Sequence, residues 1–252
     1  MSLDGRIALV TGGGRGIGRA IALGLAADGA DVAINYRRDD AAAAATVAEI
    51  ERLGRRARAY PASVDDYAHC ERLVGATIDD FGAVDILVNN AGVASRGKTV
   101  ADTEPDEMDR LWRTHAFGAW ACSKLVLPSM RTRPRGDIVM ISSAAVVHMG
   151  AFSAPYNMAK SALEALAWTL AKEERRNNVH VNVVAPGLVD TEMGRRLVRG
   201  AMGVDDIRTM DANAPFEHVC TPDEVADAVR FVVSDRASYL TAQRIGVDGG
   251  PF

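Results

Sequence analysis

The apolar residues of this chain fall into short, continuous runs that alternate with longer segments of helical periodicity. The short runs are rich in Val, Ile and Leu and are bounded by turn-forming or charged residues. Runs of this length and composition are typical of strands buried on both faces. The strands expected on this basis cover residues 7–10, 32–36, 57–60, 84–88, 137–142, 179–184 and 244–247.

Helical segments separate these runs. Gly29 and Gly54 follow the first two segments, where a glycine commonly ends a helix. Pro105 suits the first turn of the fourth segment, and Pro128 predicts its end, because proline cannot continue the backbone hydrogen bonds of a helix. The expected helices run from the glycine loop to about 28, then over 40–53, 66–80, about 105–127, 155 to about 176, and about 222–234.

This alternation implies parallel strands joined by right-handed crossovers. We therefore predict an α/β fold, a single Rossmann-like doubly wound parallel sheet of about seven strands with helices on both faces. No linker rich in Pro, Gly or Ser divides the chain, so residues 1–252 are expected to form one domain. Ligands of such sheets bind beyond the carboxyl ends of the strands.

The bulk composition argues against several classes of function. A net charge of −4 disfavours nucleic-acid binding, which needs a concentrated basic surface. No stretch approaches the roughly 20 apolar residues of a membrane helix, and the apolar run 7–10 is too short for the core of a signal peptide. Cys70, Cys122 and Cys220 have no metal-ligand spacing, so neither zinc nor disulfides are expected. We expect a cytoplasmic protein without a metal site.

A glycine loop follows the first expected strand. Gly12, Gly16 and Gly18 are spaced G-x-x-x-G-x-G, with Arg15 and Ile17 between them. Glycines at this point let the backbone turn tightly and approach a pyrophosphate, whose charge the helix N-terminus favours. Isolated glycines here could be simple turn formers, but the three together favour dinucleotide binding.

The end of the second strand indicates which dinucleotide binds. An acidic residue there would bind the ribose hydroxyls of NAD, but this chain has Asn35, Tyr36, Arg37 and Arg38. Guanidinium groups suit a 2′-phosphate, which they can hold with paired hydrogen bonds. We predict a preference for NADP(H), with NAD(H) as a possible second cofactor. The alternative is that both arginines only solubilise a loop.

Tyr156 and Lys160 are four residues apart in an expected helix, so both side chains lie on one face. A neighbouring cation favours the phenolate, which makes tyrosine able to act as an acid or base. A pair of this kind on its own is more often a solvated helix face. Ser142 and Ser143, however, end the strand thirteen residues before the tyrosine.

The glycine loop, the two serines and the Tyr156/Lys160 pair resemble the short-chain dehydrogenase/reductase family over essentially the whole chain. Members similar to 3-oxoacyl-ACP reductases and glucose dehydrogenases are the ones it resembles. The resemblance implies that Tyr156 is the general acid or base, that Lys160 lowers its pKa and holds the nicotinamide ribose, and that Ser143 binds the substrate oxygen. Such donors suit hydride addition, since the oxygen becomes alkoxide-like. Because successive side chains of a strand point to opposite faces, Ser142 is expected to point away from Tyr156.

The resemblance also implies further contacts with the cofactor. Ser63 and Val64 follow the third expected strand, and the segment 90–92 follows the fourth and is expected to brace the sheet. The segment 186–191 follows the sixth strand. The cofactor-binding residues implied beyond the glycine loop and Tyr36 to Arg38 are Ser63, Val64, Asn90, Ala91, Gly92, Tyr156, Lys160, Pro186, Gly187 and Thr191.

Two positions depart from the family pattern. His115 replaces an asparagine of the central helix that is thought to hold a water connected to the lysine. Histidine titrates near neutrality, so His115 either substitutes in the proton relay, impairs it, or serves only in packing. Ser63 replaces an aspartate that often binds the adenine amino group, and we expect looser adenine recognition.

The function expected is hydride transfer between NADP(H) and a carbonyl or alcohol, with a 3-oxoacyl thioester as one possible substrate. The segment 190–216 is the expected substrate lid, and its apolar residues indicate weakly a hydrophobic carbonyl compound. These residues are Met193, Leu197, Met202, Met210 and Phe216. The alternative is a dinucleotide-binding sensor or scaffold with little turnover.

The resemblance further implies a homotetramer or homodimer built on the two long helices. Aromatic and apolar residues available for that contact are Trp112, Phe117, Trp120, Leu166 and Trp168.

Overall fold

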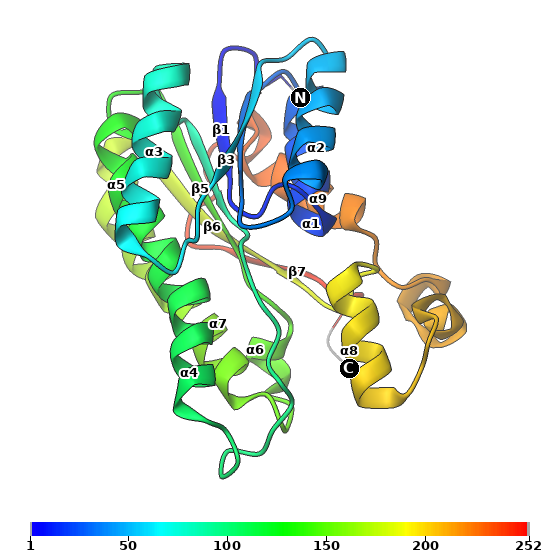
Figure 1. Ribbon diagram of the computed structural model, residues 1–252. Helices are drawn as coiled ribbons and strands as arrows, with labels where there is room; N and C mark the ends of the chain where they lie inside the picture. The colour runs from blue at the N-terminus through cyan, green and yellow to red at the C-terminus, as the bar shows by residue number, and fades with distance from the viewer. Residues whose placement is uncertain (1, 251–252) are drawn as a thin grey trace.

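A computed structural model describes residues 2–250 of the chain (Figure 1). Seven strands form one parallel sheet in the order β3-β2-β1-β4-β5-β6-β7. The strands are β1 (Ile7–Val10), β2 (Asp31–Tyr36), β3 (Ala57–Pro61), β4 (Ile86–Asn89), β5 (Gly136–Ile141), β6 (Val179–Pro186) and β7 (Arg244–Val247). The predicted fold and strand number are confirmed.

The helices connect successive strands. They are α1 (Gly16–Ala27), α2 (Asp40–Arg52), α3 (Tyr67–Phe81), α4 (Pro105–Trp112), α5 (Gly118–Met130), α6 (Ala145–His148), α7 (Ala154–Glu174), α8 (Glu192–Met202) and α9 (Pro222–Val232). Short turns complete the elements: the π-helical turn η1 (Arg113–Phe117) and the 3-10 turns η2 (Arg175–Asn177), η3 (Ile207–Asn213), η4 (Pro215–Glu217) and η5 (Asp235–Ala237).

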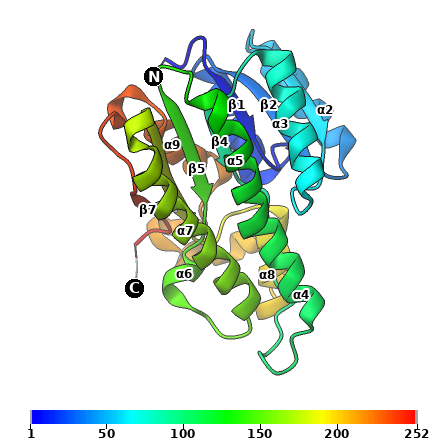
Figure 2. The same cartoon turned by 90° about the vertical axis from the view of Figure 1, so that its left-hand side faces the viewer.

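The sheet is covered by two helical layers. Helices α3, α5 and α7 lie on one face, and α1, α2 and α9 lie on the other (Figures 1 and 2). Successive side chains of β1 enter opposite cores, Leu9 the first and Ala8 and Val10 the second. Because both faces are covered, strands in the middle of the sheet such as β1 are apolar at successive positions, which explains their continuous hydrophobic runs.

The strand order reverses direction at β1, which lies between β2 and β4. Val10 pairs in register with Ile34 of β2 and with Val88 of β4, so the three strands end close together. The glycine loop after β1 therefore emerges where the strand order reverses, which is the usual position of a ligand crevice in such sheets.

The helix predicted over 105–127 differs from the structure. It comprises α4, the π turn η1 and α5, and it continues past Pro128 to Met130. Pro128 lacks the N–H that would bond to the preceding turn, but only two helical residues follow it, so few hydrogen bonds are lost. The prediction that Pro128 stops the helix is wrong.

The expected lid, residues 190–216, contains α8 and η3 and ends in η4. Neither α8 nor the short α6 was predicted as a helix. Among residues 2–250, no helix is both long and apolar enough to cross a membrane.

Candidate active site

Ser143, Tyr156 and Lys160 meet at the carboxyl end of β5. Ser143 lies two residues beyond the strand, and Tyr156 and Lys160 occupy successive turns at the start of α7, with Pro155 in its first turn. The Ser143 hydroxyl hydrogen-bonds the Tyr156 phenol. The Lys160 Nζ lies 5.8 Å from the centre of the Tyr156 ring. The sequence spacing therefore brings together the three side chains that it singled out.

Burial and the Ser143 hydrogen bond shift the pKa of the Tyr156 phenol in opposite directions. Burial raises the pKa of the phenol above its ordinary value of 10.0, and the hydrogen bond from Ser143 partly offsets that rise. The phenol is consequently protonated at neutral pH, as a proton donor must be.

Lys160 is a buried lysine. Its Nζ donates a hydrogen bond of 2.6 Å to the carbonyl oxygen of Ile141. Desolvation lowers the pKa of the amine from 10.5 to about 7, while the carboxylate of Glu164 raises it. Near neutrality the side chain is therefore close to half protonation, so small changes around it alter its charge.

Ser142 points away from Tyr156, as strand alternation predicts. Its buried hydroxyl donates a 2.6 Å hydrogen bond to Oε1 of Glu164. Arg244 of β7 donates to the same carboxylate oxygen at 3.1 Å and to the carbonyl oxygen of Ser143 at 3.1 Å. Glu164 and Arg244 were not predicted from the sequence, although Glu164 is four residues after Lys160 on the same helix face.

The glycine loop has the shape of a phosphate cradle. A Cβ on Gly18 would lie 2.3 Å from the carbonyl oxygen of Gly12 and 2.4 Å from Nδ2 of Asn90. Gly12 and Gly16 have φ of +64° and +53°, which favour glycine. Helix α1 begins at Gly16, so its first backbone N–H groups point out of the loop. These residues fit a dinucleotide pyrophosphate.

Thr11 and Asn90 tie the loop to the end of β4. The Thr11 hydroxyl accepts hydrogen bonds from the backbone N–H groups of Asn90 and Ala91, at 2.9 and 3.0 Å. The Asn90 amide donates back to the carbonyls of Thr11 and Gly12. This part of the expected Asn-Asn-Ala-Gly segment therefore braces the sheet.

The basic residues after β2 are exposed. Tyr36 ends the strand, and Arg37 and Arg38 follow in a bend before α2. Asn35 is instead buried, and its amide donates to the carbonyls of Tyr60 and Ala62. Its function is to join neighbouring strands. The exposed side chains directly after β2 are those of Arg37 and Arg38, followed by Asp39 and Asp40 at the start of α2.

Arg15 at the start of α1 forms an exposed ion pair with Glu192 of α8, with 3.1 Å between the charged atoms. The glycine loop and the segment expected as a lid therefore touch at this point. After β3, the backbone N–H of the partly exposed Ser63 donates a hydrogen bond to Nδ1 of His69 at 3.3 Å. The next residue, Val64, packs in the core against Gly118.

The end of β6 carries the remaining expected cofactor residues. Pro186 closes the strand, and the Gly187 N–H donates to the carbonyl of Val247 at 3.0 Å. The Thr191 hydroxyl caps α8 by accepting from the Gly194 N–H. A Cβ on Gly16 would lie 3.4 Å from the Thr191 methyl group, so Thr191 lies beside the glycine loop.

His115 lies in the π turn between α4 and α5. Its ring is edge-on to the Tyr156 ring, with 5.3 Å between the two ring centres. Its Nε2 contacts the backbone of Val93, and no side chain or backbone group among residues 2–250 hydrogen-bonds its buried Nδ1. Desolvation and the positive charge of Lys160 lower the pKa of the imidazole to about 3. Burial beside the Lys160 cation therefore keeps the His115 imidazole neutral near pH 7, because its pKa lies well below that value.

The His115 ring lies against Gly92 and borders a small cavity. A Cβ on Gly92 would lie 2.8 Å from Cε1 of the imidazole, so the close approach of the loop needs glycine. With Thr11, Asn89 and Thr114, His115 also borders an internal cavity of about 10 Å³.

Apolar side chains are exposed on both segments that follow the site strands. Val147, Met149 and Phe152 lie in and after α6, and Met193 and Leu197 lie on α8. Both helices are at the carboxyl end of the sheet, at the bottom of Figure 1. Of the five apolar lid residues, Met210 packs against the small cluster of Val198, Ile207 and Val219, and the other four are exposed.

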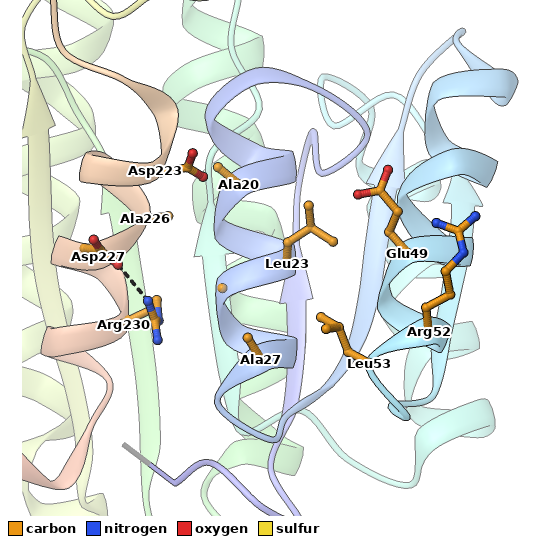
Figure 3. Close-up of a pocket in the computed structure, with 11 residues that line it drawn as sticks. Ala20, Leu23, Ala27, Glu49, Arg52, Leu53, Asp223, Ala226, Asp227 and Arg230 are labelled. Carbon is orange, nitrogen blue, oxygen red and sulfur yellow. Dashed lines mark hydrogen bonds and ion pairs between the residues drawn. The ribbon is translucent and has the colours of Figure 1, made fainter.

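A larger hollow of about 480 Å³ lies away from these groups, between α1, α2 and α9 (Figure 3). Small side chains such as Ala20 and Ala27 form its floor, and charged residues surround it. Among the charged groups, Glu49 pairs with Arg19, and Arg230 pairs with Asp227. Within residues 2–250, no group of three His, Cys, Asp or Glu side chains is placed to hold a metal ion.

Comparisons with known proteins agree with this geometry. Residues 12–251 match the family model described as "Enoyl-(Acyl carrier protein) reductase". The chain is 35% identical over 250 residues to a 3-oxoacyl-[acyl-carrier-protein] reductase of Synechocystis sp., covering 99% of this chain and 98% of the relative. It is 33% identical over 257 residues to an L-rhamnose 1-dehydrogenase (NAD(P)(+)) of Sphingomonas sp., covering 99% and 97%.

Among solved structures, a short chain dehydrogenase of Burkholderia cenocepacia in complex with NADP superimposes with a TM-score of 0.89. It is 34% identical, and the match covers 99% of each chain.

Proposed function

The chain belongs to the short-chain dehydrogenase/reductase family of NAD(P)-dependent oxidoreductases, and we propose that it is an NADP(H)-preferring carbonyl reductase or alcohol dehydrogenase in which Tyr156 transfers the proton. One observation supports this most strongly. The Ser143 hydroxyl, the Tyr156 phenol and the buried Lys160 amine meet at the carboxyl end of β5. The glycine loop emerges from the same end of the sheet.

In the proposed reduction, Tyr156 donates its proton to the substrate oxygen, and Ser143 hydrogen-bonds the same oxygen as negative charge develops on it. The nicotinamide, when bound, supplies the hydride. The Lys160 ammonium stabilises the phenolate that remains after proton transfer. In the reverse direction the phenolate removes the proton from the alcohol. A general acid of this kind typically contributes about 10²- to 10⁴-fold to the rate.

The oxidation of NADPH by a panel of ketones, quinones and 3-oxoacyl thioesters tests this function. We expect turnover with at least one class and at least a ~10²-fold loss in Ser143→Ala. The competing proposal is a dinucleotide-binding sensor with little turnover. It gains support if the protein binds NADPH but neither the wild type nor His115→Asn consumes it with any substrate of the panel.

The preference for NADP(H) rests on Arg37 and Arg38, which are accessible beyond β2, and on the lack of an acidic residue among Asn35, Tyr36 and these two arginines. The Burkholderia relative is in complex with NADP, and the Sphingomonas relative is described as using NAD(P). Hydrogen bonds to a charged group contribute about 1.5–3 kcal/mol each, and 1.4 kcal/mol is tenfold in affinity.

The double variant Arg37→Ala/Arg38→Ala is therefore expected to weaken NADPH binding by at least about tenfold and to leave NADH binding unchanged. Arg52→Ala is the control, because this exposed arginine lies at the far end of α2. Equal effects of the double variant on both cofactors would contradict the proposed preference.

We assign His115 a positioning role rather than proton transfer. Its neutral ring contacts the backbone of Val93, Gly92 and the edge of Tyr156, so it sets the distance between the loop after β4 and the phenol. A His115→Asn variant should lower kcat while the pH profile of kcat/KM keeps its shape. A new or missing ionisation in that profile would instead indicate that His115 takes part in proton transfer.

The substrate is proposed to be an apolar carbonyl compound, held between the α6 segment and the lid at 190–216. Support comes from the exposed apolar residues of both segments. Three non-glycine residues there have positive φ, namely Met149, Phe152 and Phe216. Backbone strain of this kind is often concentrated at ligand-binding segments. The Synechocystis relative is a 3-oxoacyl-ACP reductase, which makes a 3-oxoacyl thioester the first substrate to try.

We also propose that the protein is a homotetramer with contacts through α5 and α7. These helices run side by side on the surface that faces the viewer in Figure 2. Trp120 of α5 and Trp112 at the end of α4 are large exposed side chains, at 41% and 49%, and exposed aromatic groups are common in interfaces. Sedimentation of the wild type should give a tetramer and of Trp120→Glu a smaller species. A monomeric wild type at micromolar concentration would overturn this.

A further inference from the structure

Three consecutive residues at the end of β5 are each held by a different ionisable side chain. Lys160 donates to the carbonyl oxygen of Ile141 at 2.6 Å. Glu164 accepts from the hydroxyl of Ser142 at 2.6 Å. Arg244 donates to the carbonyl oxygen of Ser143 at 3.1 Å. The backbone that presents Ser143 to Tyr156 is therefore fixed residue by residue.

Glu164 and Arg244 also pair with each other, with 3.1 Å between Nε and Oε1. Their side chains are only 9% and 23% exposed, and they come from α7 and β7, which are distant in sequence. Removing a pair of charges from water opposes their mutual attraction, so such a pair is weak evidence for added stability. Its contacts with the residues around Ser143 suggest a role in the site.

The carboxylate of Glu164 also bears on the charge of Lys160. The two residues are one helical turn apart on α7, so their side chains share a face. Burial lowers the pKa of Lys160 to about 7, and Glu164 is the group that opposes this fall. The other titratable or charged groups around the amine are Tyr156 on the same helix, the neutral His115 from the π turn, and Arg244 behind Glu164.

We propose that Glu164 and Arg244 are positioning residues for the reaction. Glu164 keeps the buried amine of Lys160 protonated. Arg244 holds the Ser143 backbone and weakens the influence of the Glu164 carboxylate on the Lys160 ammonium. The inference rests on the proposed function for its catalytic meaning. The electrostatic part can be measured without any turnover.

The chain has four lysines, Lys98, Lys124, Lys160 and Lys172. In protein labelled with ¹³C at lysine Cε, the signal that disappears in Lys160→Met reports the ionisation of this residue directly. Glu164→Gln keeps the shape and an oxygen that accepts from Ser142 but removes the charge. We expect the Lys160 titration midpoint to fall by about one pH unit, since a nearby opposite charge typically has an effect of at least this size.

Arg244→Met should move the same midpoint in the opposite direction, to higher pH, because a positive charge near the ammonium is removed. A general loosening of the structure would shift both variants the same way. Glu174→Gln is the matched control, since Glu174 is another buried glutamate of α7 paired with an arginine, Arg131, at the far end of the helix. It should leave the Lys160 midpoint unchanged.

Turnover separates this inference from the proposed function. If Glu164→Gln lowers the midpoint, kcat/KM should lose activity at a correspondingly lower pH than in the wild type. An unchanged midpoint in Glu164→Gln, or shifts of the same sign in Glu164→Gln and Arg244→Met, would refute the inference even in an active enzyme. Opposite shifts in a protein whose Tyr156→Phe variant is as active as the wild type would support the network and refute the proposed function.

Discussion

Replacing Lys160 by methionine should make the protein more stable at pH 6 while it abolishes turnover. The amine is buried, and its pKa falls from 10.5 to about 7 because burial penalises the ammonium. Methionine has a similar length and no charge to desolvate. The substitution therefore removes a group that opposes folding but that the proposed reaction requires.

The magnitude follows from the pKa. A fall from 10.5 to about 7 is equivalent to about 5 kcal/mol of unfolding free energy, because each unit of pKa is worth about 1.4 kcal/mol. Between these two values the unfolded chain binds more protons than the folded one, so the stability of the wild type rises with pH in that window. The penalty is complete below pH 7. The lost hydrogen bond to Ile141 offsets about 1–3 kcal/mol of the gain.

Lys160→Met should therefore exceed the wild type by about 2 kcal/mol or more at pH 6, and the difference should close as the pH approaches about 9. Urea unfolding at both pH values and at one protein concentration measures this. Lys172→Met is the control, because Lys172 is an exposed lysine of the same helix. The reasoning is refuted if Lys160→Met is no more stable than the wild type at pH 6, or if the difference is the same at both pH values.

Three further predictions follow. The kcat/KM for carbonyl reduction should fall as pH rises through about 7, since Lys160 then loses its proton; a profile that is flat from pH 6 to 8 would contradict the role of its charge. Gly18→Ala should abolish NADPH binding and destabilise the fold by about 1–3 kcal/mol, because the added Cβ would lie 2.3 Å from a carbonyl oxygen; Gly75→Ala, with open space around it in α3, should instead stabilise the protein by up to about 1 kcal/mol, as circular dichroism melts can show. Glu224 and the carbonyl of Phe216 raise the pKa of His218, so the stabilisation by their contact is complete below the ordinary value of 6.5 and is lost as pH rises through the raised pKa. Amide protection factors over 207–218, corrected for the intrinsic pH dependence of exchange, should fall across that range in the wild type, and a similar fall in His218→Gln would assign it to another group.

The apolar runs were sufficient to predict the central strands because β1, β4 and β5 are buried at every position, whereas β3 and β7 at the two edges of the sheet are only partly buried. Their ends also located the site: the glycine loop after β1 and Ser143 after β5 lie where the alternation of strands and helices requires. Helical spacing predicted that Tyr156 and Lys160 share one face, and both lie in α7, which begins at Ala154; their proposed chemical role depends on the family resemblance. Local pattern is informative here because it determines which face of an element each residue occupies.

Other features depend on contacts between distant segments. The π turn at 113–117 has an ordinary helical sequence, and the helix continues past Pro128 because few bonds remain to be lost there. Arg244 of β7 pairs with Glu164 of α7 across eighty residues of sequence, and they meet because β7 pairs with β6 and α7 packs on β6. The neutral state of His115 likewise follows from its burial beside Lys160, which its position in the sequence does not reveal.

The central claim is that Tyr156 is the proton donor of an NADPH-dependent carbonyl reduction. The most direct test compares Tyr156→Phe with Tyr239→Phe, a control at a side chain that is 99% exposed, with NADPH affinity and NADPH oxidation measured for both. We predict that both variants bind NADPH as the wild type does, that Tyr239→Phe keeps full turnover, and that Tyr156→Phe loses at least about 10²-fold in kcat. Turnover in Tyr156→Phe within a few-fold of the wild type would contradict the account.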